Sequence, residues 1–197
     1  ALNVEIAAVD SLEKIPFLPI RFFKTHKVVS GDASADLVFE SSGTTGSTNS
    51  RHYVKDPGIY EESFLKNFKL NYGPLEEFCI IGLLPSYLER NNSSLIYMVN
   101  RLIQGTGNRL SGFYLNEFQQ LADTLKTLEK GKQKTLLIGV SFAVLDFAQQ
   151  FPIPLKHTIV METGGMKGRR EELVREELHS RLKSAFGLDS IHSEYGM

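Results

Sequence analysis

Short apolar runs alternate with longer stretches of helical period from Asp36 to the end of the chain. Continuous apolar runs of this length, bounded by polar residues or proline, predict buried strands. The predicted strands are 36–40, 78–84, 135–140, 157–161 and a short one near 190–192.

Apolar side chains recur three or four positions apart between these strands, and this spacing predicts amphipathic helices. Asn, Ser and Pro near the start of a stretch and Gly at its end are typical helix boundaries. The helices are expected to begin at Asp56–Gly58, after a cap at Asn91 or Asn92, after a cap at Asn116, after a cap at Ser141, and at Arg170.

Strands that alternate with helices predict an α/β fold, with a largely parallel sheet covered by helices on both faces. Ligands of such sheets bind beyond the carboxyl ends of the strands. Residues 1–35 differ, because Pro16 and Pro19 lie in an apolar segment that favours neither a helix nor a central strand. We therefore expect an extended arm at 1–35, packing on an α/β nucleotide-binding domain at 36–197.

The chain has 197 residues and a net charge of −1, so its composition argues against a nucleic-acid partner. No apolar run approaches the length of about 20 residues that a membrane span needs. Cys79 is the single cysteine and lies in an apolar run, which predicts a buried structural thiol. Low cysteine use is compatible with a reducing cytoplasm, which is the expected location.

A loop rich in hydroxyl groups follows the first predicted strand. Its glycines allow close approach of the backbone N–H groups to an anion, and its hydroxyl groups can donate to phosphate oxygens. The loop consists of Ser41, Ser42, Gly43, Thr44, Thr45 and Gly46.

Composition alone would make this loop an ordinary surface turn. It is not a Walker A loop, because the chain contains no Gly-Lys-Ser or Gly-Lys-Thr tripeptide, and this disfavours a kinase. The histidines show no spacing typical of a helical metal site, and His179 is expected to be solvated on a charged helix face.

The loop resembles the phosphate-binding signature of the adenylate-forming superfamily, which includes acyl-CoA synthetases and luciferases. Two later segments resemble the same family in kind and in order. Glu162-Thr163-Gly164-Gly165 is similar to its glycine segment near the adenine, and Glu194-Tyr195-Gly196-Met197 to the start of its Tyr-Gly-x-Thr-Glu motif.

The resemblance implies a ligase that uses ATP and Mg²⁺ to activate a carboxylic acid, and fatty acids are the expected substrates. The acyl-adenylate would pass its acyl group to a thiol of a protein cysteine or of coenzyme A. The loop and Arg51 would hold the phosphates, while Gly164, Gly165, Glu194, Tyr195 and Gly196 would line the adenine or acyl pocket.

Within the superfamily the chain is most similar to acyl-protein synthetases, the fatty-acid-activating subunits of the reductase complex in bacterial bioluminescence. That similarity rests on Phe17-Leu18-Pro19, Phe22-Phe23-Lys24 and Ser50-Arg51-His52. It implies a reductase or acyl-donor protein as partner. Most members carry Pro-Lys where this chain has Thr48-Asn49, so Arg51 is either the replacement cation for pyrophosphate or a surface arginine.

The chain begins without methionine and stops inside the last motif, which suggests an incomplete N-terminal part. By the resemblance, the threonine and the magnesium-binding glutamate would follow Met197, as would the C-terminal lid domain with its lysine. Such a fragment is expected to bind nucleotide weakly and not to turn over. The alternative is a non-catalytic nucleotide- or acyl-binding module that keeps the fold.

Overall fold

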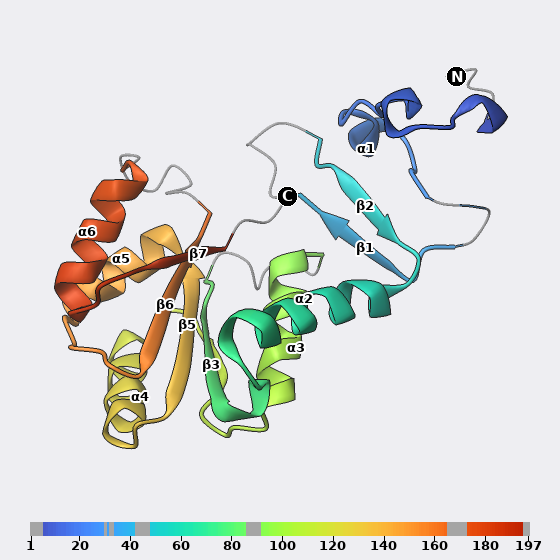
Figure 1. Ribbon diagram of the computed structural model, residues 1–197. Helices are drawn as coiled ribbons and strands as arrows, with labels where there is room; N and C mark the ends of the chain where they lie inside the picture. Colours follow the sequence, from blue (N-terminus) through green and yellow to red (C-terminus); the bar gives the residue numbers. More distant parts are fainter. Residues whose placement is uncertain are drawn as a thin grey trace. The chain divides into compact units, whose positions relative to one another are not determined.

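A computed structural model describes residues 6–29, 31, 34–41, 48–85, 92–164 and 173–194 of the chain (Figure 1). The chain divides into two compact units, Ala1–Pro57 and Gly58–Met197. The boundary therefore lies after Pro57, whereas the sequence placed the start of the α/β domain at Asp36. The difference arises because the strand expected to open that domain pairs with a second short strand of the first unit.

Among the described residues, five strands form the sheet of the second unit, and each neighbouring pair is parallel. They are β3 (Phe78–Leu83), β4 (Gly112–Tyr114), β5 (Lys134–Val140), β6 (Thr158–Thr163) and β7 (His192–Glu194). The predicted α/β class with a largely parallel sheet is therefore confirmed.

The strands lie in the order β4-β3-β5-β6-β7. Counted along the chain this order is 2-1-3-4-5, as in flavodoxin-like doubly wound sheets. The order reverses between β3 and β5, and in such sheets ligands bind near this point, outside the carboxyl ends of the strands. The carboxyl edge of the sheet is therefore where a ligand is expected.

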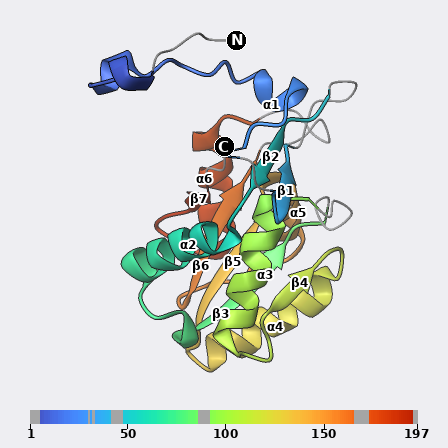
Figure 2. The ribbon, with the colours of Figure 1, turned by 90° about the vertical axis from the view of Figure 1, so that its right-hand side faces the viewer.

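Helices cover both faces of the sheet, as predicted (Figures 1 and 2). On one face lie α2 (Pro57–Tyr72) and α3 (Ser94–Thr106), where the rings of Tyr60 and Tyr97 are 6.1 Å apart. On the other face lie α4 (Phe118–Lys130), α5 (Ser141–Gln150) and α6 (Arg175–Phe186). Phe147 of α5 contacts rings of both α4 and α6, and this joins the three helices into one layer.

The core lies between these helix layers and the sheet. All six residues of β3 are buried, and β5 is buried from its second residue onward. Their apolar character on both faces is the reason that they form interior strands. Cys79 of β3 is fully buried, and burial raises the pKa of its thiol, so the predicted structural thiol is confirmed.

Two helix caps differ from the prediction. Ser93 rather than Asn91 or Asn92 caps α3, because the Ser93 hydroxyl accepts a hydrogen bond from the backbone N–H of Ile96. Glu117 rather than Asn116 is the residue that precedes α4. Each is a shift of one or two positions, which changes the boundary and leaves the helix in place.

The last helix begins at Arg175, later than the predicted Arg170, and the residues from 165 to 172 lie outside the described part. Val174 precedes the helix and is exposed. The stop at Gly187 is confirmed, since Gly187 has the positive φ of 64° that this type of helix end requires. None of the described helices is of a length and apolarity that would let it cross a membrane.

The first unit is built from short elements: η1 (Ile6–Ala8), η2 (Leu12–Lys14), α1 (Phe22–Thr25), β1 (Leu37–Glu40) and β2 (Arg51–Val54). In the second unit η3 (Leu75–Glu77) precedes β3. The strands β1 and β2 pair antiparallel in a sheet of their own. The predicted strand at 36–40 is thus confirmed, but it is not part of the parallel sheet.

Candidate functional site

Two of the predicted site segments meet at the carboxyl edge of the sheet. Gly164 follows β6 directly and Glu194 ends β7, and the parallel pairing of these strands sets Thr163 opposite Glu194. The Thr163 hydroxyl donates a hydrogen bond of 2.6 Å to the Glu194 carboxylate. Residues 31 positions apart in sequence thereby form one polar pair at the end of two neighbouring strands.

The surroundings of Glu194 on this face are aromatic. Tyr60 of α2 donates from its hydroxyl to the carbonyl of Ser94 at the start of α3. The pKa of Tyr60 is raised, first by burial and then by the negative charge of Glu194. The charge of Glu194 therefore acts on a phenol from the α2–α3 layer, which places that layer close to the Thr163–Glu194 pair.

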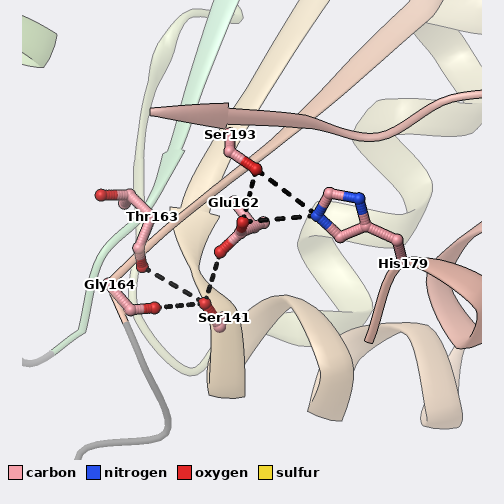
Figure 3. A network of polar contacts seen from close by, with 6 residues as sticks. All are labelled: Ser141, Glu162, Thr163, Gly164, His179 and Ser193. Atoms are coloured by element: carbon pink, nitrogen blue, oxygen red, sulfur yellow. Dashed lines mark hydrogen bonds and ion pairs between the residues drawn. The ribbon is translucent and has the colours of Figure 1, made fainter. Parts of the chain in front are cut away.

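A second polar cluster lies on the opposite face of the same two strands (Figure 3). Side chains alternate between the two faces along a strand, so Glu162 and Ser193 point away from the Thr163–Glu194 pair and toward α5 and α6. The Ser193 hydroxyl donates to Glu162 Oε1 at 2.6 Å. We call Ser141, Glu162, His179 and Ser193 the Glu162 cluster.

Ser141 completes this cluster from the first turn of α5. The sequence predicted it as a helix cap, but the residue before α5 is Val140 and no side-chain cap bond forms. The Ser141 hydroxyl lies instead 2.7 Å from Glu162 Oε2 and also contacts the carbonyl oxygen of Gly164. Since Ser141 is buried, these polar groups are satisfied inside the protein.

His179 was expected to be solvated, and this prediction is wrong. Its side chain is only 20% exposed, and Nε2 lies 3.4 Å from both Glu162 Oε1 and Ser193 Oγ. The charged appearance of α6 in the sequence concealed the one face that packs on β6 and β7. A histidine beside the buried Leu178 and Leu182 of the same helix was the available signal.

The Glu162 cluster contains the residue types of a Ser-His-Glu triad but not its geometry. In a triad the histidine lies between the two partners, with one ring nitrogen on the serine and the other on the acid. Here Nε2 faces both partners, and the Ser193 hydroxyl donates directly to Glu162. The arrangement therefore does not activate Ser193 as a nucleophile.

The predicted phosphate loop belongs to the first unit. Ser41 ends the pairing of β1 with β2: its N–H donates to the Ser50 carbonyl and its hydroxyl accepts from the Ser50 N–H, each at 2.9 Å. Ser42, Gly43, Thr44, Thr45 and Gly46 lie outside the described residues. The strand before the loop was predicted, whereas the returning strand β2 was not.

Arg51 is the first residue of that returning strand. Its Nε donates to Glu40 Oε1 at 3.0 Å, directly across the two-stranded sheet. The pKa of Arg51 is raised, chiefly by its hydrogen bond with Tyr53 and then by Glu40. A phosphate group would have to compete with these partners for the guanidinium.

The other predicted pocket residues lie outside the described part of the chain: Gly165, Tyr195 and Gly196. Three of the segments outside it, 86–91, 165–172 and 195–197, follow the carboxyl ends of β3, β6 and β7. Among the described residues no three His, Cys, Asp or Glu side chains are gathered so as to hold a metal ion.

Shallow hollows occur elsewhere on the second unit. One runs along α4 and is lined by Leu110, Glu117, Gln119, Gln120, Asp123, Thr124 and Thr127. Another lies between α5 and α6. Neither is lined by a residue of the Thr163–Glu194 pair or by Gly164, so we assign the candidate site from the strand ends rather than from these hollows.

Comparison of the chain with protein-family models, with curated proteins and with solved structures returned no match. The resemblance of the three sequence segments to the adenylate-forming superfamily therefore stays a prediction, and the function below rests on the residues and their placement.

Proposed function

We propose that the carboxyl edge of β6 and β7 binds the nucleoside part of ATP and that the protein activates a carboxylic acid as an acyl-adenylate. The observation that carries this proposal is the direct pairing of Thr163 with Glu194. Two segments picked out by their resemblance to one nucleotide site, far apart in sequence, end side by side at the edge where parallel sheets bind ligands.

The helix N-termini at this edge favour an anionic ligand, whereas the carboxylates of Glu194 and of Glu176 and Glu177 in the first turn of α6 oppose one. The crossover helices α3, α5 and α6 each follow a strand of the parallel sheet, so their N-termini lie toward its carboxyl edge. Helix N-termini carry partial positive charge and free N–H groups, which stabilise phosphate. The helix N-termini thus support a nucleotide over a neutral ligand.

In the proposed reaction a carboxylate oxygen attacks the α-phosphorus of ATP, and pyrophosphate leaves. A thiolate then attacks the acyl carbonyl carbon, and AMP leaves with the acyl–phosphate bond electrons. The chemistry needs mainly positioning and stabilisation of negative charge. Gly164 and Glu194 would orient the base, and the phosphate-binding role of the 41–46 loop and Arg51 stays a prediction from the sequence resemblance.

Magnesium would neutralise the phosphate charge when bound. It prefers carboxylate oxygens together with phosphate oxygens. Glu194 is a carboxylate of the right type at this edge, but it already accepts from Thr163. Because Glu194 is also assigned to the base, the described residues offer no separate magnesium donor, and the sequence resemblance implies a magnesium-binding glutamate after Met197.

Acid-dependent exchange of pyrophosphate into ATP tests the activity. The protein produced from its full reading frame would be incubated with Mg²⁺ and with long-chain, aromatic and short acids in turn. Exchange that needs one class of acid is the expected result. ATP binding without exchange for any acid would favour the non-catalytic module, and transfer of the γ-phosphate to an acceptor would indicate a kinase.

The site itself is tested by ATP binding to Glu194→Gln and Thr163→Val. We expect both variants to weaken binding about tenfold, the effect of one lost or altered hydrogen bond near a charge. Glu76→Gln, on η3 before the amino end of β3, is the matched control and should bind like the unmodified protein. Equal affinities of all these proteins for ATP would show that the nucleotide does not bind at this edge.

A further inference from the structure

The Glu162 cluster joins four elements behind the candidate site. Ser141 comes from α5, Glu162 from β6, His179 from α6 and Ser193 from β7. Glu162 is 7% exposed and holds Ser141 on one carboxylate oxygen and Ser193 on the other. One side chain thereby connects the carboxyl ends of three neighbouring strands, since Ser141 directly follows β5.

The cluster cannot touch a ligand held by the Thr163–Glu194 pair from the α2–α3 side. Glu162 and Ser193 contact residues of α5 and α6, whereas Glu194 acts on Tyr60 of α2. The sheet backbone lies between the two groups of side chains. Any influence of the cluster on the site therefore passes through the positions of the strand ends.

This influence is direct because residues of the cluster and of the candidate site are adjacent in sequence. Thr163 and Glu194 each follow a cluster residue in sequence, so the Glu162–Ser193 bond fixes the spacing of the strands one residue before the candidate site. Ser141 also contacts the Gly164 carbonyl, where the backbone leaves β6 with a positive φ of 67°. The Gly164 carbonyl is thus held from the α5 side of the sheet (Figure 3).

We propose that Glu162, held by Ser141, His179 and Ser193, is a positioning residue that fixes the spacing of Thr163, Gly164 and Glu194 for nucleotide binding. The role in nucleotide binding rests on the function proposed above; the role in fixing the strand ends does not. Stability comes chiefly from the apolar core, while the cluster determines the geometry of the site.

An isosteric pair of variants at Ser193 separates positioning from packing. Thr and Val have nearly the same shape and both suit a strand, but only Thr keeps the hydroxyl group that reaches Glu162. Ser193→Val should weaken ATP binding by the intact protein about tenfold, the scale of one hydrogen bond, whereas Ser193→Thr should stay within about twofold of the unmodified protein.

Amide hydrogen exchange of the strand ends provides a readout that needs no nucleotide. Exchange at Thr163, Gly164 and Glu194 should be about tenfold faster in Ser193→Val than in Ser193→Thr, while the buried strand β3 stays protected in both. The variants His179→Gln and His179→Leu form a similar pair. Amide exchange at the strand ends should be slower in His179→Gln than in His179→Leu, because Gln retains an N–H donor near the position of Nε2.

The outcomes are distinguishable. In one outcome the unmodified protein fails to bind ATP while Ser193→Val and Ser193→Thr differ in amide exchange at the strand ends. In that case the proposed function fails and the structural role of the cluster stands. If Ser193→Val and Ser193→Thr behave alike in both ATP binding and amide exchange, the positioning role is overturned. Faster exchange throughout Ser193→Val, β3 included, would show a general loss of stability and would also overturn it.

Discussion

The two units of this chain hold their predicted site residues in different ways. In the second unit Gly164 and Glu194 extend from parallel strands that are paired on a buried core. In the first unit Ser41 and Arg51 lie on a two-stranded antiparallel sheet, which is marginal as an isolated element, and Arg51 is exposed. The large core holds Gly164 and Glu194 in place. Ser41 and Arg51 are held by hydrogen bonds across a small sheet. That sheet has few apolar contacts, among them the buried Phe39 and the Phe23–His52 ring pair.

Both units expose large apolar side chains, but they differ in their buried core: among the described residues of the first unit, Phe39 is the one buried hydrophobic residue. The exposed large apolar side chains of the first unit lie between residues 12 and 20: Leu12, Ile15, Phe17, Leu18 and Ile20. In the second unit Phe147, Phe186 and Leu182 are fully buried. Stability measurements will therefore report on the second unit, and the first unit must be probed by local methods.

The largest expected effect comes from one substitution made in each unit. Phe147→Ala should lower the free energy of unfolding by about 3–5 kcal/mol, because a fully buried ring leaves a cavity. Phe17→Ala should change it by less than about 0.5 kcal/mol, because Phe17 is 96% exposed. Urea unfolding measures both. A large effect of Phe17→Ala would show that the arm is covered in solution.

A substitution at Gly139, where the order of the strands reverses, should have the next largest effect on stability. A Cβ on Gly139 would lie 2.6 Å from Val144 Cγ2 and 2.9 Å from the Leu83 carbonyl oxygen, where β3 and β5 adjoin α5. Gly139→Ala should therefore cost about 1–3 kcal/mol of stability through overpacking. Gly112→Ala in β4 is the control, because a Cβ there meets open space. Equal unfolding midpoints for the two variants would contradict this close packing.

Acid should weaken the second unit through Glu61. Hydrogen bonds from Arg101 and then from Tyr97 hold the pKa of Glu61 below its ordinary value of 4.5. A carboxyl group with a lowered folded pKa stabilises the protein above its unfolded pKa, and this contribution is lost as pH falls from about 4.5 through the folded pKa. Glu61→Gln should flatten the fall in melting temperature over that window. Glu76→Gln is a control without these two partners, and an unchanged acid limb in Glu61→Gln would refute the assignment.

The smallest effect is expected from the corresponding pair of the first unit. Glu40 and Arg51 make one cross-strand contact, whereas Arg101 contacts both carboxylate oxygens of Glu61. A double-mutant cycle with Glu40→Gln and Arg51→Gln should give a weaker coupling than the cycle for Glu61 and Arg101. High salt should abolish the Glu40–Arg51 coupling first. Stronger coupling in the first unit would mean that its sheet is held more firmly than its exposure suggests.

Much of the second unit was predictable because its local signals agree with its packing. Continuous apolar runs identified β3, β5 and β6, and the helical spacing of apolar residues after Asp56–Gly58 identified α2. The three-residue strand β4 and the strand β2 were missed, because neither has an apolar run long enough to stand out. The pairing of β4 is decided by β3, a partner distant in sequence, whereas β2 pairs with the nearby β1.

The candidate site was predictable only in part for the same reason. The sequence motifs indicated Gly164 and Glu194, and the parallel sheet brought the two segments together. The Glu162 cluster was missed because its members are single polar residues in four different elements. Ser141 has the sequence signal of a helix cap and His179 that of a solvated helix face, and only the tertiary structure turns both toward Glu162.

The short edge strands have a consequence for how the protein behaves at high concentration. The outer strands of the parallel sheet, β4 and β7, have three residues each, whereas the inner strands have six or seven. Self-association by strand addition needs a long row of unpaired backbone groups, and short edge strands do not offer one. We therefore expect the hydrophobic inner strands, the most aggregation-prone segments by composition, to be shielded once the sheet has formed and to be vulnerable only while it folds.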